Sequence, residues 1–267
     1  MTTSEEKNYT RRENRMLIHP LIDQLRGLKL YAMAACLEEQ MKMKDIIKYS
    51  FEDRLGMLVD REAITRSNRQ ITRRLSKAKL KINACMEDID YTVRRGIDRS
   101  MMMRFASCRW VHDHRGIILT GPTGSGKTWI ACALAHKACL EGYSTLYKRV
   151  PNFLREIEAS RELGTYDKLM TRLGKTDLII LDDWGLEKLN QRQSLAILEL
   201  LEDRYNVRST IIASQIPAEK LYETVKDPTI ADAIVDRLLN NSYKIDLSTE
   251  ESMRRMSGEL TEERMNN

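Results

Sequence analysis

Eight residues, from Gly121 to Thr128, constrain this chain more than any other part of it, because they follow the spacing G-x-x-x-x-G-K-[ST]. In such a loop the backbone N–H groups close around a phosphate, the lysine neutralises phosphate oxygens and the threonine hydroxyl is offered to Mg²⁺. The apolar run at 116–120 predicts a buried strand before the loop, and 128–141 predicts a helix whose dipole favours an anion. The residues expected to contact a nucleotide are Gly121, Pro122, Thr123, Gly124, Ser125, Gly126, Lys127, Thr128 and Trp129.

A second acidic element is needed to hold the metal ion of a nucleotide, and residues 177–183 provide a candidate. Four apolar residues predict a buried strand, and Asp182 follows at its carboxyl end, where it can bind Mg²⁺ together with Thr128. Asp183 is then the candidate that orients the attacking water and takes its proton. The alternative for both acids is that they only cap the helix that follows.

Two weaker candidates for catalysis accompany Lys127, Asp182 and Asp183. Residues 209–214 predict a strand next to the strand of the glycine-rich loop, so Ser214 or Gln215 at its end could touch the γ-phosphate or the water. A polar strand end also has a purely structural explanation. Arg237 lies on an expected helix beyond that strand and is a candidate arginine finger, with an exposed surface arginine as the alternative.

The rest of the chain shows two kinds of pattern. Further strands are expected at 144–150 and 242–247, and helical stretches lie between all of the strands, so we expect an α/β fold with a parallel sheet. Residues 17–104 contain few prolines and glycines and predict successive helices, with breaks at Gly27 and Gly56.

The excess of basic over acidic residues lies entirely in the first hundred residues. They contain 21 Lys and Arg against 15 Asp and Glu, whereas the rest of the chain is nearly balanced. On a helix, Ile64, Ile71, Leu75, Ala78 and Ile82 form one apolar stripe, opposite a row of cations. Such a row is expected to contact DNA phosphates without reading bases, unless it is only a solvated face. These cations are Arg66, Arg69, Arg73 and Lys77, and Lys148 with Arg149 is a second candidate contact.

Four segments and several exclusions follow from these patterns. We expect a disordered lead at 1–15, a helical domain for DNA binding and oligomerisation at 16–104, a nucleotide-binding core at 105–250 and a charged tail at 251–267. No apolar run approaches the ~20 residues that span a bilayer, and no signal peptide is visible, so a cytoplasmic, membrane-free protein is expected. The five cysteines lack metal-ligand spacing, which predicts reduced thiols.

Several phrases together resemble the IstB-like helper ATPases of bacterial insertion sequences, relatives of the DnaC-type helicase loaders in the AAA+ superfamily. The most specific phrases lie at 21–26, 51–55, 87–91, 121–128 and 181–185. The resemblance implies an AAA+ core with a five-stranded parallel sheet in the order 5-1-4-3-2 and an extra helix within 151–172. It implies ATP and Mg²⁺ as cofactors, homo-oligomers that assemble on double-stranded DNA, a cognate transposase as partner, and an Arg237 that acts in a neighbouring subunit.

Three rival functions remain open at this point. A DnaC-like loader of a replicative helicase would use the same ATPase chemistry. A small-molecule P-loop kinase is less well supported, because we see neither a second phosphate loop nor an arginine-rich lid. A GTPase is disfavoured because no N-K-x-D element, which reads guanine, is present.

Overall fold

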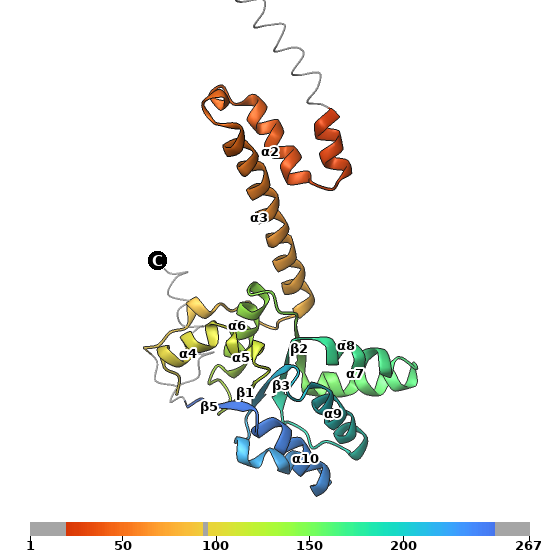
Figure 1. Ribbon diagram of the computed structural model, residues 1–267. Coiled ribbons are helices and arrows are strands. Elements are labelled where there is room, and N and C mark those ends of the chain that lie inside the picture. Colours follow the sequence, from red (N-terminus) through yellow and green to blue (C-terminus); the bar gives the residue numbers. More distant parts are fainter. Residues whose placement is uncertain (1–19, 93–95, 249–267) are drawn as a thin grey trace, which may run out of the picture. The chain divides into compact units, whose positions relative to one another are not determined.

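The computed structural model describes residues 20–92 and 96–248 (Figure 1). The predicted disordered lead at 1–15 and the charged tail at 251–267 lie outside these residues. The chain forms two compact units that divide between Thr72 and Arg73, within the long helix α3 (Phe51–Ala78). The predicted boundary after residue 104 is therefore wrong, since Met86 and Met102 belong to the hydrophobic core of the second unit.

The first unit is helical, as predicted. Its elements are a helix over residues 20–27, α2 (Tyr31–Lys42), the short 3₁₀ helix η1 (Ile46–Lys48) and most of α3. Gly27 ends the first helix as expected, but Gly56 lies inside α3, which continues through it at the usual cost of about 1 kcal/mol. The carboxylate of Glu62 accepts the N–H groups of Ala32 and Met33, so α3 caps the first turn of α2.

The second unit contains a five-stranded sheet in which every neighbouring pair of strands is parallel. The order is β2-β3-β4-β1-β5, which confirms the predicted order 5-1-4-3-2. Because all strands run the same way, their carboxyl ends meet at one edge of the sheet, where ligands of open α/β sheets bind. The strands are β1 (Gly116–Thr120), β2 (Thr145–Arg149), β3 (Leu178–Trp184), β4 (Ser209–Ser214) and β5 (Ser242–Asp246).

Helices cover both faces of the sheet (Figure 1). Side chains alternate along each strand, so that Ile118 and Ile212 pack on one face while Ile117 and Ile211 pack on the other. The first face carries α7 (Val150–Glu162), α8 (Tyr166–Lys175), α9 (Gln191–Arg204), the 3₁₀ helix η3 (Ala218–Thr224) and α10 (Pro228–Leu239). The second face carries η2 (Met86–Asp88), α4 (Arg99–Ala106), α5 (Arg109–His112) and α6 (Lys127–Leu140).

The segment expected to form one extra helix at 151–172 forms two. Helices α7 and α8 are separated at Gly164, whose φ of +63° is left-handed and ends the first helix. The extra helical element after β2 is thus present. It begins one residue before and ends three residues after the expected range of 151–172.

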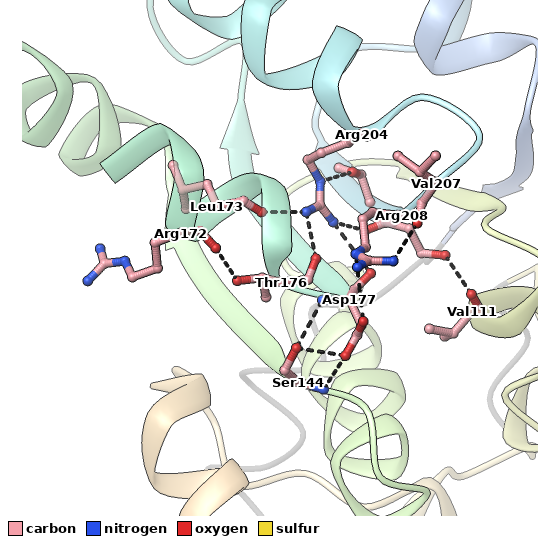
Figure 2. Close-up of polar contacts among 11 residues, drawn as sticks. Val111, Ser144, Arg172, Leu173, Thr176, Asp177, Arg204, Val207 and Arg208 are labelled. Carbon is pink, nitrogen blue, oxygen red and sulfur yellow. Dashed lines mark hydrogen bonds and ion pairs between the residues drawn. The ribbon is translucent and has the colours of Figure 1, made fainter. Parts of the chain in front are cut away.

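A buried arginine ties the amino ends of β3 and β4 to the end of α8 (Figure 2). Arg204, in the last turn of α9, is 2% exposed and donates to the carbonyls of Leu173 and Thr176, both at 2.7 Å. It also donates to the carbonyl of Ser209. Burial lowers the pKa of Arg204 to about 9, so the guanidinium is still charged at neutral pH. These bonds hold the sheet at the edge opposite to the glycine-rich loop.

No helix in residues 20–92 and 96–248 is both long and apolar enough to cross a membrane. The five cysteines are free thiols, and all but Cys85 are buried. Within the same residues, no three His, Cys, Asp or Glu side chains come together as a metal site.

Candidate nucleotide-binding site

The glycine-rich loop connects the carboxyl end of β1 to the start of α6. Gly121, Gly124 and Gly126 have φ angles of +138°, +86° and +92°, which side-chain-bearing residues rarely adopt. A Cβ atom on Gly121 would also lie 2.0 Å from the carbonyl oxygen of Leu247. Helix α6 begins directly after the loop, at Lys127. The first N–H groups of the helix lack intrahelical partners and can bind an anion.

Two side chains of the loop bear on phosphate binding. Lys127 Nζ donates to the carbonyl oxygens of Gly121 and Pro122, at 2.8 Å each, so the ammonium lies over the loop itself. The hydroxyl of Ser125 is fully buried and has no hydrogen-bond partner within the described part of the chain. A buried hydroxyl without a partner costs about 1–3 kcal/mol, which a bound phosphate oxygen or a water would recover.

Thr128 and Asp182 lie together, as the sequence predicts. The Thr128 hydroxyl is 3.0 Å from Oδ1 and 2.9 Å from Oδ2 of Asp182, which is 1% exposed at the carboxyl end of β3. Two adjacent ligands of an octahedral Mg²⁺, each about 2.1 Å from the ion, are about 3 Å apart. The pair therefore fits the metal ion that accompanies a nucleoside triphosphate.

Two side chains that the sequence did not single out also surround Asp182. Tyr147, on the neighbouring strand β2, donates its hydroxyl to Asp182 Oδ2 at 2.6 Å, and Lys81 Nζ lies 3.8 Å from the same oxygen. Burial, followed by the hydrogen bond to Asp182, raises the pKa of Tyr147, so the phenol remains a donor at physiological pH. A polar residue inside the strand at 144–150 was the available signal for Tyr147, whereas nothing local marks Lys81.

Asp183 follows Asp182 within β3, at a point where the strand is irregular. Its φ of +59° is left-handed, and the pairing of β3 with β4 shifts register between Leu181 and Trp184. Its carboxylate accepts a hydrogen bond from Arg149 Nε at 2.5 Å, and this contact raises the pKa of Arg149. The structure therefore pairs two residues that the sequence assigned separately, Asp183 to the attacking water and Arg149 to DNA.

Of the two candidates at the end of β4, only Gln215 remains available. The Ser214 hydroxyl is fully buried, donates to the Trp184 carbonyl at 3.0 Å and accepts the N–H of Ile216 at 3.0 Å. Ser214 thus joins the ends of β3 and β4 and is not placed to touch a γ-phosphate. Gln215 is exposed at the same edge of the sheet and keeps its candidate role.

Trp129 contributes to the core more than its sequence position suggested. Its indole packs against the hydrophobic cluster under the second face of the sheet. Because it belongs to the first turn of α6, only its backbone N–H is suited to a phosphate contact. Its predicted role in nucleotide binding is restricted to the main chain.

Arg237 lies far from the glycine-rich loop of its own chain. It lines a small cavity with Gly116 and Ser242, the first residues of β1 and β5, whereas the loop follows the last residue of β1. Four residue steps along β1 correspond to about 13 Å. The Arg237 guanidinium donates to Glu202 Oε1 at 2.7 Å and to the Ala233 carbonyl at 2.8 Å. This placement excludes Arg237 from its own nucleotide site.

The predicted DNA-contacting residues divide into two groups. Arg66, Arg69, Arg73 and Lys77 are exposed along α3, although Glu62 forms an ion pair with Arg66 at 2.8 Å. The apolar stripe behind them is incomplete, since Ile64 is 59% exposed and Ile82 lies beyond the end of the helix. Lys148 is mostly buried, pairs with Glu156 and packs over the Phe153 ring. With Arg149 bound to Asp183, neither residue of that second group presents a free cation.

Comparison with known proteins agrees with these features. The family described as IstB-like ATP binding protein matches residues 23–260. An insertion sequence ATP-binding protein of Sinorhizobium fredii, y4pL, is 44% identical over 90% of this chain and 98% of its own length. The ATP-binding protein of insertion sequence IS1162 of Pseudomonas fluorescens is 41% identical over 76% of this chain and 88% of its own.

Solved structures show the same fold at low sequence identity. DnaI has a TM-score of 0.54 at 24% identity and covers 62% of this chain and 92% of its own. The DnaC helicase loader has a TM-score of 0.53 at 18% identity and covers 64% of this chain and all of its own. At this level of identity the two likenesses show the fold alone.

Proposed function

The chain belongs to the family of IstB-like ATP-binding proteins, and we propose that it assembles with ATP on double-stranded DNA and helps a cognate transposase to select or remodel its target. Membership of this family makes the chain a P-loop ATPase of the AAA+ type. The observation that carries the proposal is a divided site, with Thr128 and Asp182 behind the loop and Arg237 at the opposite end of β1.

The side chains in and beside the glycine-rich loop each have a role in the proposed hydrolysis of ATP. Lys127 neutralises the β- and γ-phosphate oxygens, and Thr128 with Asp182 would hold Mg²⁺, which supplies positive charge against the same oxygens. A water oxygen attacks the γ-phosphorus while the bond to the ADP oxygen breaks. Asp183 orients that water and accepts its proton.

The ion pair between Arg149 and Asp183 gives a physical reason for dependence on DNA. While Asp183 is bound to the guanidinium, one of its carboxylate oxygens is occupied and is not available to orient a water. A DNA phosphate offers Arg149 an alternative anion, and the exchange would release Asp183 for hydrolysis.

The position of Arg237 supports assembly of several subunits. An arginine finger stabilises the charge that develops on the transferred phosphoryl group, and it can be worth 10³ to 10⁵ in rate. Arg237 cannot reach its own loop, so we assign it to the nucleotide site of a neighbouring subunit. ATP would then be shared by two chains, and hydrolysis would weaken the contact between them.

Contact with DNA is assigned to the cations along α3, and salt dependence tests it. Log affinity for duplex DNA falls with log salt at a slope of roughly −0.9 for each phosphate neutralised. We expect Arg69→Ala with Arg73→Ala to make that slope shallower by about 1.8. The control is Lys188→Ala with Arg192→Ala, which removes the same charge from exposed positions outside α3. A slope that matches the control removes α3 from the interface.

A DnaC-like helicase loader is the alternative function, and the fold likeness to the DnaC helicase loader is the observation that favours it. The two functions differ in the partner and not in the ATPase chemistry. Preferential binding to long duplex DNA with ATP supports the transposition helper. Tight binding to a replicative helicase hexamer, with no preference for duplex, supports the loader.

A further inference from the structure

The carboxylate of Asp182 is held by more groups than the metal site requires. It is 1% exposed, and its two oxygens contact the Thr128 hydroxyl, the Tyr147 hydroxyl at 2.6 Å and, more distantly, Lys81 Nζ at 3.8 Å. Thr128 is accounted for as the second metal ligand. Tyr147 and Lys81 have no role in the steps described above, and both approach Oδ2.

Tyr147 is placed to orient the carboxylate. It lies in the middle of β2, where it pairs with Ile180 two residues before Asp182 on β3. The 2.6 Å hydrogen bond therefore links two adjacent strands of one sheet, which are rigid elements. A hydroxyl that donates to a ligating carboxylate fixes its orientation, and removing such a partner typically weakens metal binding 10- to 100-fold.

Lys81 differs from Tyr147 in that its positive charge opposes the binding of a metal ion. It lies three residues after the end of α3, where the backbone of Lys81 and Ile82 interacts with the Cys132 thiol of α6. That anchoring brings the ammonium to the one acid of the metal site. An ammonium near Asp182 compensates the carboxylate when no metal is bound, and it repels a divalent cation that occupies the same side chain.

We propose that Tyr147 and Lys81 are two further residues of the nucleotide site that act on Mg²⁺ in opposite directions. Tyr147 is a positioning residue that holds Asp182 ready for the metal. Lys81 is a counter-ion that competes with the metal, so loading of Mg²⁺ with ATP loosens the segment that follows α3. The inference rests on the proposed use of Mg²⁺ by this site.

The test titrates Mg²⁺ against full-length protein with a fluorescent N-methylanthraniloyl ATP and follows binding, not turnover. Lys81→Met keeps most of the apolar stem and removes the charge, so the Mg²⁺ concentration for half-maximal binding should fall about three- to tenfold. Tyr147→Phe removes only the hydroxyl, so the same concentration should rise about tenfold. Lys81→Arg keeps the charge and should remain within twofold of the wild type. Lys220→Met and Tyr222→Phe, both in exposed positions of η3, are the matched controls.

The two variants are expected to shift the Mg²⁺ midpoint in opposite directions, which distinguishes the proposed roles from a general loss of structure. A variant that merely loosens the fold would weaken binding in both cases, and circular dichroism with binding in excess EDTA checks that each variant is folded. The inference is overturned if Lys81→Met and Tyr147→Phe shift the midpoint in the same direction or not at all while the wild type depends on Mg²⁺. A wild type that binds the analogue equally well with and without Mg²⁺ overturns both the inference and the proposed metal site.

Discussion

The ion pair between Arg149 and Asp183 leads to a prediction about basal ATP hydrolysis. Replacing Arg149 with methionine removes the guanidinium that binds the proposed water-orienting carboxylate. The two side chains are 45% and 21% exposed, and the bond is 2.5 Å long. Unit charges 4 Å apart attract by about 1 kcal/mol in water and about 4 kcal/mol at an effective dielectric constant of 20. Because both groups are partly exposed, the lower figure applies.

About 1 kcal/mol corresponds to a roughly fivefold change in the fraction of chains whose Asp183 is released. Steady-state ATP hydrolysis by Arg149→Met without DNA should therefore rise about fivefold, and saturating duplex DNA should add little. Arg155→Met is the control, since Arg155 lies on the following helix and donates to Asn152 and the Pro151 carbonyl. Unchanged basal hydrolysis together with intact stimulation by DNA would refute this account of the pair.

Three other predictions concern single side chains. Asp183→Asn should bind ATP and assemble on DNA but hardly hydrolyse ATP, and turnover at the wild-type rate would remove Asp183 from the role of orienting water. Glu62→Gln should speed hydrogen exchange at Ala32 and Met33 in the full-length protein. The hydrogen bond from Arg66 and those from Met33 and Ala32 outweigh burial and lower the pKa of Glu62 from 4.5. Its stabilisation is therefore complete above about pH 4.5 and is lost as the pH falls further, and protection factors that stay constant between pH 5 and 3 would contradict it. Arg204→Met should lower the free energy of unfolding, measured by urea denaturation, by about 3 kcal/mol. The exposed control Arg172→Met should lower it by about 0.5 kcal/mol, and equal losses would contradict the role of the buried guanidinium.

The sheet and the loop were predictable because their signals are local. Continuous apolar runs placed β1 and β4 at their observed bounds, and the glycine spacing placed the loop between β1 and α6. Strand β3 continues through Trp184, three residues past the predicted end, because a shift in register carries the chain beyond Asp182. The strand order came from the family resemblance and not from the spacing of the strands.

The features that were missed depend on contacts between segments distant in the sequence. Lys81 reaches Asp182 across a hundred residues, and the Ser214 hydroxyl is used by Trp184 on another strand. The domain boundary was misplaced for a similar reason, since residues 73–92 and 96–104 share the helical composition of the first unit but belong to the second. Composition records what a segment is made of, whereas burial depends on the partner that covers it.

Arg149 and Lys148 illustrate the same limit for charge. Both are cations near the end of a strand, and the sequence alone favoured a polyanionic partner for them. In the folded chain each finds a carboxylate, Asp183 and Glu156 respectively. A count of charges cannot distinguish a cation that awaits DNA from one that an acid already binds.

The proposed function depends above all on the binding of ATP by the main-chain N–H groups of the loop and the ammonium of Lys127. Equilibrium binding of the fluorescent ATP analogue to the wild type and to Lys127→Ala, at saturating Mg²⁺, tests it most directly. The wild type should bind the analogue, and Lys127→Ala should lose affinity at least tenfold while remaining folded. Equal affinity of the two proteins would contradict it.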